Sequence, residues 1–184
     1  IKHDNTKVFR GSNYKSYGFS VRYIKDSDKT VQDYDGNVYD VVEIGDQKWI
    51  NQNLKTTTYN EGTPISLVSD SLSWLNRAIE AYCWYNNDAA SNAVNYGALY
   101  NWYAVETGNL CPDGWRVPTD DDWKQLEMEL GMSQAEADVE GWRGTNQGSK
   151  LAGDALLWSD GIMESNPEFN SSDFNAHPGG TRLN

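Results

Sequence analysis

The side chains that could act as nucleophiles, bases or metal ligands in this chain are few and far apart. The two histidines, His3 and His177, belong to no metal-ligand or catalytic pattern, such as paired histidines on one helical face. The two cysteines, Cys83 and Cys111, do not form a C-x-x-C pair. A cysteine nucleophile beside a histidine base would need a chance meeting in the tertiary structure. We therefore predict no catalytic residue, no metal site and no enzyme activity.

The cysteines allow two structural interpretations. Cys83 and Cys111 could form a single disulfide bond, which would persist in an oxidising compartment, or they could be two buried thiols. Both alternatives stay open at this point.

Acidic and amide residues gather in several short runs. Residues 120–122 are all aspartate and follow a threonine, which is where the positive end of a helix dipole favours carboxylates. Oxygen ligands for calcium could come from residues 33–37, 86–88 and 154–160, but none of these runs has the spacing of the helix-loop-helix calcium site. We predict no cofactor and keep calcium as the alternative.

Length and charge narrow the class of protein. A chain of 184 residues is long enough for one well-filled domain. Its formal net charge of −12 disfavours nucleic acid and anionic lipid as partners, because both would repel it. No run of apolar residues is long enough to cross a bilayer, so we also predict no membrane insertion.

Turn residues and apolar periodicity predict a loop-rich α+β fold with antiparallel sheets and two or three short helices. Residues 31–54 alternate strand patterns with Asp-Gly-Asn and Gly-Asp turns, which predicts a three-stranded meander. Residues 96–105 place apolar side chains on one helical stripe. Capping boxes open helices at Thr119 and Ser133, and glycines end them.

Seven strings of sequence carry a resemblance to a known family. They are DGNVY (35–39), IGDQKW (44–49), NLKT (53–56), YCWYNND (82–88), YGALYNWYA (96–104), LCPDGWRVPT (110–119) and HPGG (177–180). In this order they resemble the Fibrobacter succinogenes major paralogous domain, a family of secreted or surface-anchored bacterial domains common in Bacteroidetes. The resemblance implies a C-type-lectin-like fold, related also to the formylglycine-generating enzyme, and a secreted or cell-surface location.

The order of the elements departs from the family at the start of the chain. Residues 15–26 resemble the family's last strand, with alternating Tyr17, Phe19, Val21 and Tyr23. We therefore divide the chain into residues 1–28, a terminal strand, and residues 29–184, a main body that lacks the family's penultimate strands. Tyr23 replaces a cysteine that the family often has, so a family disulfide at that position is lost here.

Three explanations fit this order: a segment cut across tandem copies, a circular permutation, or a subunit whose first strand completes its neighbour. A domain that lacks closing strands exposes a sheet edge, which an extended segment can fill by strand addition. Head-to-tail contacts of that kind build filaments. Residues 1–26 could equally fold back onto their own chain, because a short closure costs little entropy.

These observations predict a non-catalytic bacterial module for binding or assembly, with the chain itself or a surface glycan or protein as partner. In the assembly case it is a filament subunit joined through an assembly strand that holds Tyr17, Phe19, Val21 and Tyr23. The first alternative is a calcium-dependent carbohydrate-binding adhesin. The second is an oxidase of the formylglycine-generating type, which would need reactive cysteines in a cleft.

Overall fold

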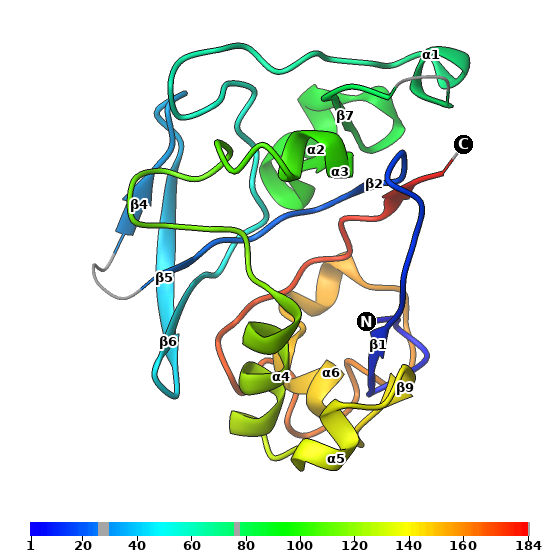
Figure 1. Ribbon diagram of the computed structural model, residues 1–184. Helices are drawn as coiled ribbons and strands as arrows, with labels where there is room; N and C mark the ends of the chain where they lie inside the picture. Colours follow the sequence, from blue (N-terminus) through cyan, green and yellow to red (C-terminus); the bar gives the residue numbers. More distant parts are fainter. Residues whose placement is uncertain (26–29, 76–77, 184) are drawn as a thin grey trace.

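The computed structural model describes residues 1–25, 30–75 and 78–183, and these form a mixed α+β fold (Figure 1). The described residues contain three antiparallel sheets and six short α-helices. The α+β class and the antiparallel sheets are as predicted. The expected number of two or three helices is wrong, because several stretches expected to be loops contain single helical turns.

The predicted meander is confirmed in residues 30–50. Its strands are β4 (Thr30–Gln32), β5 (Val38–Ile44) and β6 (Gln47–Ile50), and consecutive strands pair antiparallel. Gly36 and Gly45 take positive φ angles of 86° and 58° in the two turns, as their place in the sequence predicts. A fourth strand, β3 (Ile24–Lys25), lies antiparallel to β6 and completes the order β3-β6-β5-β4.

A second sheet joins the two ends of the described chain. Its order is β10-β2-β8-β7, with β10 at Thr181–Arg182, β2 at Gly18–Phe19, β8 at Ala98–Tyr100 and β7 at Tyr82–Trp84. A separate pair joins β1 (Val8–Arg10) to β9 (Gly141–Arg143). The chain therefore uses its first 25 residues in all three sheets.

The helices are short. They are α1 (Ser71–Leu75), α2 (Ala89–Tyr96), α3 (Trp102–Val105), α4 (Asp120–Glu129), α5 (Gln134–Ala137) and α6 (Gln147–Leu151), with 3-10 turns η1 (Tyr85–Asn87) and η2 (Ala155–Leu157). Both predicted capping boxes are present, at the starts of α4 and α5. No helix in the described ranges is long and apolar enough to cross a bilayer.

The helix predicted over residues 96–105 is wrong. The chain leaves α2 at Gly97, forms strand β8, and turns again in α3. All three residues of β8 are buried and pair with β7, and Tyr100 also pairs with Phe19 of β2. A strand buried on both faces has the same apolar composition as one stripe of a helix, so the local pattern could not separate the two.

Three clusters of buried side chains form the core. The largest surrounds Tyr23, Tyr39 and Tyr100, and a second surrounds Trp49 and Phe174. In Figure 1 the blue N-terminal segment runs from β2 through the middle of the molecule toward β5 and β6, and the red strand β10 lies beside it. Strand β2 of this segment thus lies between β8 and β10, which come about 80 and 160 residues later in the sequence.

Candidate functional site

The candidate site is the set of contacts that residues 1–25, which we call the N-terminal segment, make with the rest of the chain. In the structure the segment docks on its own chain at three places: β1 on β9, β2 between β10 and β8, and β3 on β6. The segment is therefore an internal part of the fold in this single chain. We call the elements that contact the segment its seat. They are β6, β8, β9, β10 and the loop around Arg116 that leads into α4.

The four residues predicted for the assembly strand point into this seat to different depths. Tyr23 is fully buried and Val21 is buried, whereas Tyr17 and Phe19 are partly buried. Phe19 is paired with Tyr100 of β8 on one side and Thr181 of β10 on the other. The structure thus places all four along one docked segment.

The Tyr23 hydroxyl makes the deepest polar contact of the segment. It donates a hydrogen bond of 2.5 Å to the carbonyl oxygen of Leu110, and its ring lies edge-on to Tyr39 with centroids 6.2 Å apart. Burial raises the pKa of this hydroxyl well above its usual value, so it stays protonated and remains a donor. The ring anchors the segment between the first sheet and the chain before α4.

Arg22 anchors the opposite face of the segment, and the sequence alone did not single it out. Its side chain is only 5% exposed. The guanidinium donates to the carbonyl oxygens of Ile50, Phe174 and Asn175 at 2.6 to 3.1 Å and twice to Asn53 Oδ1. These five bonds satisfy every donor of the group. This buried arginine bonds to carbonyl and amide oxygens, and it ties the segment to residues 50–53 and 174–175.

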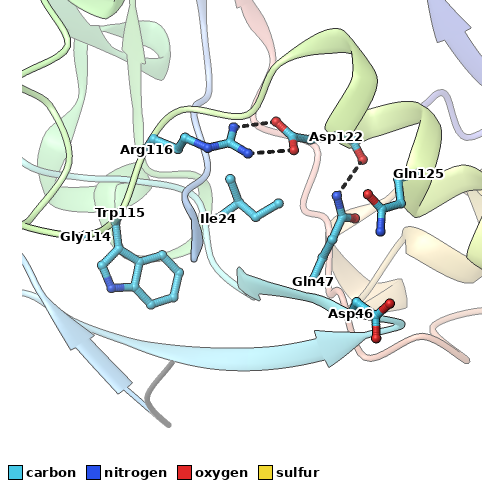
Figure 2. A pocket seen from close by; sticks show the side chains of 8 residues that line it. All are labelled: Ile24, Asp46, Gln47, Gly114, Trp115, Arg116, Asp122 and Gln125. Atoms are coloured by element: carbon cyan, nitrogen blue, oxygen red, sulfur yellow. Dashed lines mark hydrogen bonds and ion pairs between the residues drawn. The ribbon is translucent and has the colours of Figure 1, made fainter. Parts of the chain in front are cut away.

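The far end of the segment borders a polar hollow of about 460 Å³ (Figure 2). Ile24 lies at its wall, and its backbone exchanges hydrogen bonds of 3.1 and 3.3 Å with Arg116. The Arg116 guanidinium forms a two-bond ion pair with Asp122, and Gln47 donates to the Asp122 carbonyl oxygen at 3.2 Å. Figure 2 shows Asp46 and Gln125 on the other side of Gln47.

Asp122, a carboxylate in the wall of this polar hollow, is held in its ionised form. Asp122 accepts hydrogen bonds from Arg116 and also from the backbone and hydroxyl of Thr119 at 2.7 Å. The Arg116 contact, supported by Thr119, lowers the pKa of Asp122 to about 2. A carboxylate held ionised by this many donors caps α4 and fixes the loop that pairs with Ile24.

Two further hollows also lie along the N-terminal segment. One of about 660 Å³ includes Phe19, Ser20 and Arg22 in its wall, and one of about 500 Å³ includes Tyr17 and Val21. All three hollows thus have walls that combine the segment with the main body. The seat holds the segment through hydrogen bonds and a few deep side chains but leaves space on its flanks.

The two cysteines lie in different parts of the core and are not joined. Cys83 is buried beside Trp74 and Leu99, whereas Cys111 belongs to the cluster around Tyr23. Burial raises the pKa of the Cys83 thiol to about 11 and that of Cys111 further. Such thiols are poor nucleophiles at neutral pH because the reactive thiolate is scarce.

The runs considered for calcium are occupied by local hydrogen bonds. Asp33 accepts from Asn37 and from the Tyr39 hydroxyl, and Asp35 accepts from the backbone of Thr57 at 2.5 Å. Asp88 and Asp154 cap α2 and η2. Among the described residues, no group of three histidine, cysteine, aspartate or glutamate side chains is placed to hold a metal ion.

Comparison with protein families matches the model of the Fibrobacter succinogenes major domain to residues 42–184. The chain belongs to this family. No curated protein and no solved structure matches it. The family match begins after the N-terminal segment. The elements that contact the segment therefore lie within the matched range, whereas the segment itself lies outside it.

Proposed function

We propose that this member of the Fibrobacter succinogenes major domain family is a non-catalytic, secreted or cell-surface module with a C-type-lectin-like fold. Its copies assemble when the N-terminal segment of one chain docks in the seat of the next. The observation that carries the proposal is the placement of β2, which pairs with β10 and with β8 and so joins these two strands into one sheet.

The contacts of the segment suit exchange between copies. Tyr23, Arg22 and Ile24 each bond to the main body, at Leu110, at residues 50–53 and 174–175, and at Arg116. The same bonds form whether the segment comes from the same chain or from a neighbour, so the free energy of docking is similar in both arrangements. Concentration then decides which arrangement is populated, and open exchange produces chains of subunits.

The chemistry of the site supports a role without catalysis. Both thiols have raised pKa values, and Asp122 is held ionised by Arg116 and Thr119. An oxidase of the formylglycine-generating type would need accessible, reactive thiols. The strand pairing of β2 and the five hydrogen bonds of Arg22 are instead typical of a docking interaction.

The pairing of β1 with β9 allows a direct test by cysteine cross-linking. Phe9 and Trp142 are register partners, with ring centroids 5.2 Å apart, and their side chains are 53% and 37% exposed. Opposed strand positions lie within the Cα distance that a disulfide spans. A chain with Phe9→Cys is mixed with a chain with Trp142→Cys, oxidised at increasing concentration, and run on a denaturing gel.

Exchange between copies gives a disulfide-linked heterodimer whose yield rises with concentration and with incubation time. A mixture of Tyr14→Cys and Trp142→Cys chains is the control for random collisions, because Tyr14 is 74% exposed and has no strand partner at residue 142. The doubly substituted chain should give a ladder of oligomers. A doubly substituted chain that closes only on itself, with no excess heterodimer over the control at any concentration, would overturn the proposal.

A further inference from the structure

The N-terminal segment has two parts that are held in different ways. No residue of the stretch 1–17 is buried, whereas the stretch 18–24 includes Gly18 and all of residues 21–24 among the buried residues. Residues 11–15 lie between the two parts, are all exposed and belong to no strand. We call residues 1–10 the arm and residues 18–25 the inner part. The arm is therefore held by backbone contacts and by side chains that water reaches.

The backbone of the arm lies directly on the backbone of the main body. The Gly148 amide donates to the Thr6 carbonyl oxygen at 2.7 Å. The Met163 amide donates to the His3 carbonyl oxygen at 3.2 Å. A Cβ atom on Gly148 would come within 2.5 Å of the Lys7 carbonyl oxygen, so glycine permits this close approach. These contacts fix the position of the arm without burying one of its side chains.

The arm ends in a network of ion pairs. Arg10, the last residue of β1, donates to both carboxylate oxygens of Asp120, at 2.7 and 2.8 Å, and to the Asp138 carbonyl oxygen at 3.0 Å. The Lys124 ammonium lies 3.2 Å from the Asp120 carboxylate and 2.8 Å from that of Asp138. We call these four residues the clip. The side chains of Arg10 and Asp120 are 27% and 46% exposed, so the clip is open to solvent ions.

The strand that pairs with β1 is attached to the same helix by a buried contact. Arg143 of β9 makes two bonds of 2.9 Å to Glu127 of α4, and these side chains are 3% and 1% exposed. Salt shortens the range of charge interactions in water from about 10 Å at 0.1 M to about 3 Å at 1 M, but it screens buried pairs much less. Salt therefore weakens the hold on β1 and spares the hold on β9.

The inner part is also protected from salt. Arg22 is 5% exposed, and its bonds go to carbonyl and amide oxygens rather than to a charged partner. Tyr23 is fully buried and donates to the Leu110 carbonyl oxygen. Neither contact depends on an ion pair that solvent ions can reach. One change of conditions thus acts differently on the two parts of a single segment.

We propose that the arm is a salt-released clasp, which swings open about residues 11–15 when the clip is screened while the inner part stays docked. Opening uncovers the edge of β9 and frees β1 to pair with the β9 strand of a neighbour. The arm then takes the first step of exchange between copies, and this role rests on the proposed function. The opening itself takes place in a single chain and is measured there.

Four amides of the main body report on the two parts separately. Gly148 and Met163 donate to the arm, whereas Leu54 and Ile50 donate to carbonyl oxygens of the inner part at 2.9 and 3.1 Å. The test is residue-resolved hydrogen exchange of the full chain by NMR, in dilute solution, at about 0.05 M and about 1 M sodium chloride. We expect salt to speed exchange at Gly148 and Met163 roughly three- to tenfold relative to Leu54 and Ile50.

Arg10→Met removes the clip and keeps the apolar stem of the side chain. At low salt this variant should exchange at Gly148 and Met163 as fast as the native chain does at high salt, and added salt should then change the rate less than about twofold. Lys7→Met is the matched control, because it removes one positive charge from the same arm. Lys7 is exposed and forms no ion pair with the described residues, so the native salt dependence should remain.

Protection of Leu54 and Ile50 in both variants shows that the chains still fold. The proposal is wrong if salt speeds exchange equally at all four amides, because the segment then opens as one unit. It is also wrong if Lys7→Met has the same effect as Arg10→Met.

Failure of the proposed function has a different signature. A chain whose arm opens in salt, but whose Phe9→Cys and Trp142→Cys variants give no excess heterodimer at about 1 M sodium chloride, supports the clasp and contradicts exchange between copies. Heterodimer that forms several-fold faster in salt supports both.

Discussion

Ile24 and Arg116 exchange both of their backbone hydrogen bonds, at 3.1 and 3.3 Å. This pair joins the end of the N-terminal segment to the loop that leads into α4, where the Arg116 side chain meets Asp122. A backbone bridge of this kind holds the segment in register whatever side chains stand at the two positions. It is the link between the docked strand and the capped helix.

Removing the hydroxyl of Tyr23 should lower the stability of the folded chain. Tyr23→Phe leaves the buried carbonyl oxygen of Leu110 without its 2.5 Å partner, and we expect a loss of about 1–3 kcal/mol in the free energy of unfolding. Urea unfolding followed by tryptophan fluorescence measures it. Tyr14→Phe, at a residue 74% exposed, is the matched control and should change stability by less than about 0.5 kcal/mol. Equal effects at the two positions would contradict the buried anchor.

Replacing Arg22 by methionine should cost more than the loss of a single hydrogen bond. Arg22→Met keeps the apolar stem but leaves the oxygens of Ile50, Phe174, Asn175 and Asn53 unpaired, so we expect a loss of about 3 kcal/mol or more. Chemical denaturation reports the loss, and the cross-linking assay should show a weaker hold of the segment. Lys7→Met, which removes an exposed cation from the same segment, should have little effect. A stable Arg22→Met chain with unchanged cross-linking would show that the anchor is dispensable.

Acid should weaken the contact between Asp122 and Arg116 in a defined window. The pKa of Asp122 in the folded chain is lowered from 3.8 to about 2, so this contribution is complete above about pH 4 and is lost as the pH falls toward 2. Its size is about 1–2 kcal/mol once screening of the half-exposed Arg116 is allowed for.

Unfolding curves of the native chain and of Asp122→Asn, measured between pH 5 and 2, should therefore converge at the acid end, since the amide does not titrate. Asp121→Asn is the matched control, because the Asp121 side chain is 94% exposed. A gap between the native and Asp122→Asn curves that stays constant down to pH 2 would contradict the assigned role.

The buried ion pair behind α4 should be costly to break. Arg143 and Glu127 are joined by two hydrogen bonds of 2.9 Å, with side chains only 3% and 1% exposed. Glu127→Ala leaves the arginine charge buried without its partner, which typically costs about 3–5 kcal/mol. Glu43→Ala, at a side chain 67% exposed, is the control for a surface pair. Calorimetric melting temperatures that fall equally in the two variants would refute this assignment.

Local signals predicted the elements whose hydrogen bonds close within a few residues. The capping boxes at Thr119 and Ser133 and the glycine turns of the meander form between neighbours in sequence, so the residue types are sufficient to place them. The helix predicted for the apolar stretch around β8 was wrong, because burial on both faces removes the alternation of apolar and polar residues that marks a strand.

The candidate site was predictable only in part. The alternation of Tyr17, Phe19, Val21 and Tyr23 indicates a docking strand, and all four residues lie in the seat. The burial of Arg22 could not be predicted from the sequence, because arginine is rarely buried and its burial here depends on carbonyl oxygens from residues far along the chain. Its place between two of the predicted strand residues was the one available signal.

By itself, the sequence determined the family, the caps, the turns and the presence of an extended segment with one apolar face, because these depend on residue type and short-range spacing. Only the tertiary structure decided which partners the segment meets and that Arg22 is its second anchor. Those features depend on contacts between residues more than a hundred positions apart, such as Arg22 and Phe174, and no local pattern encodes such a meeting.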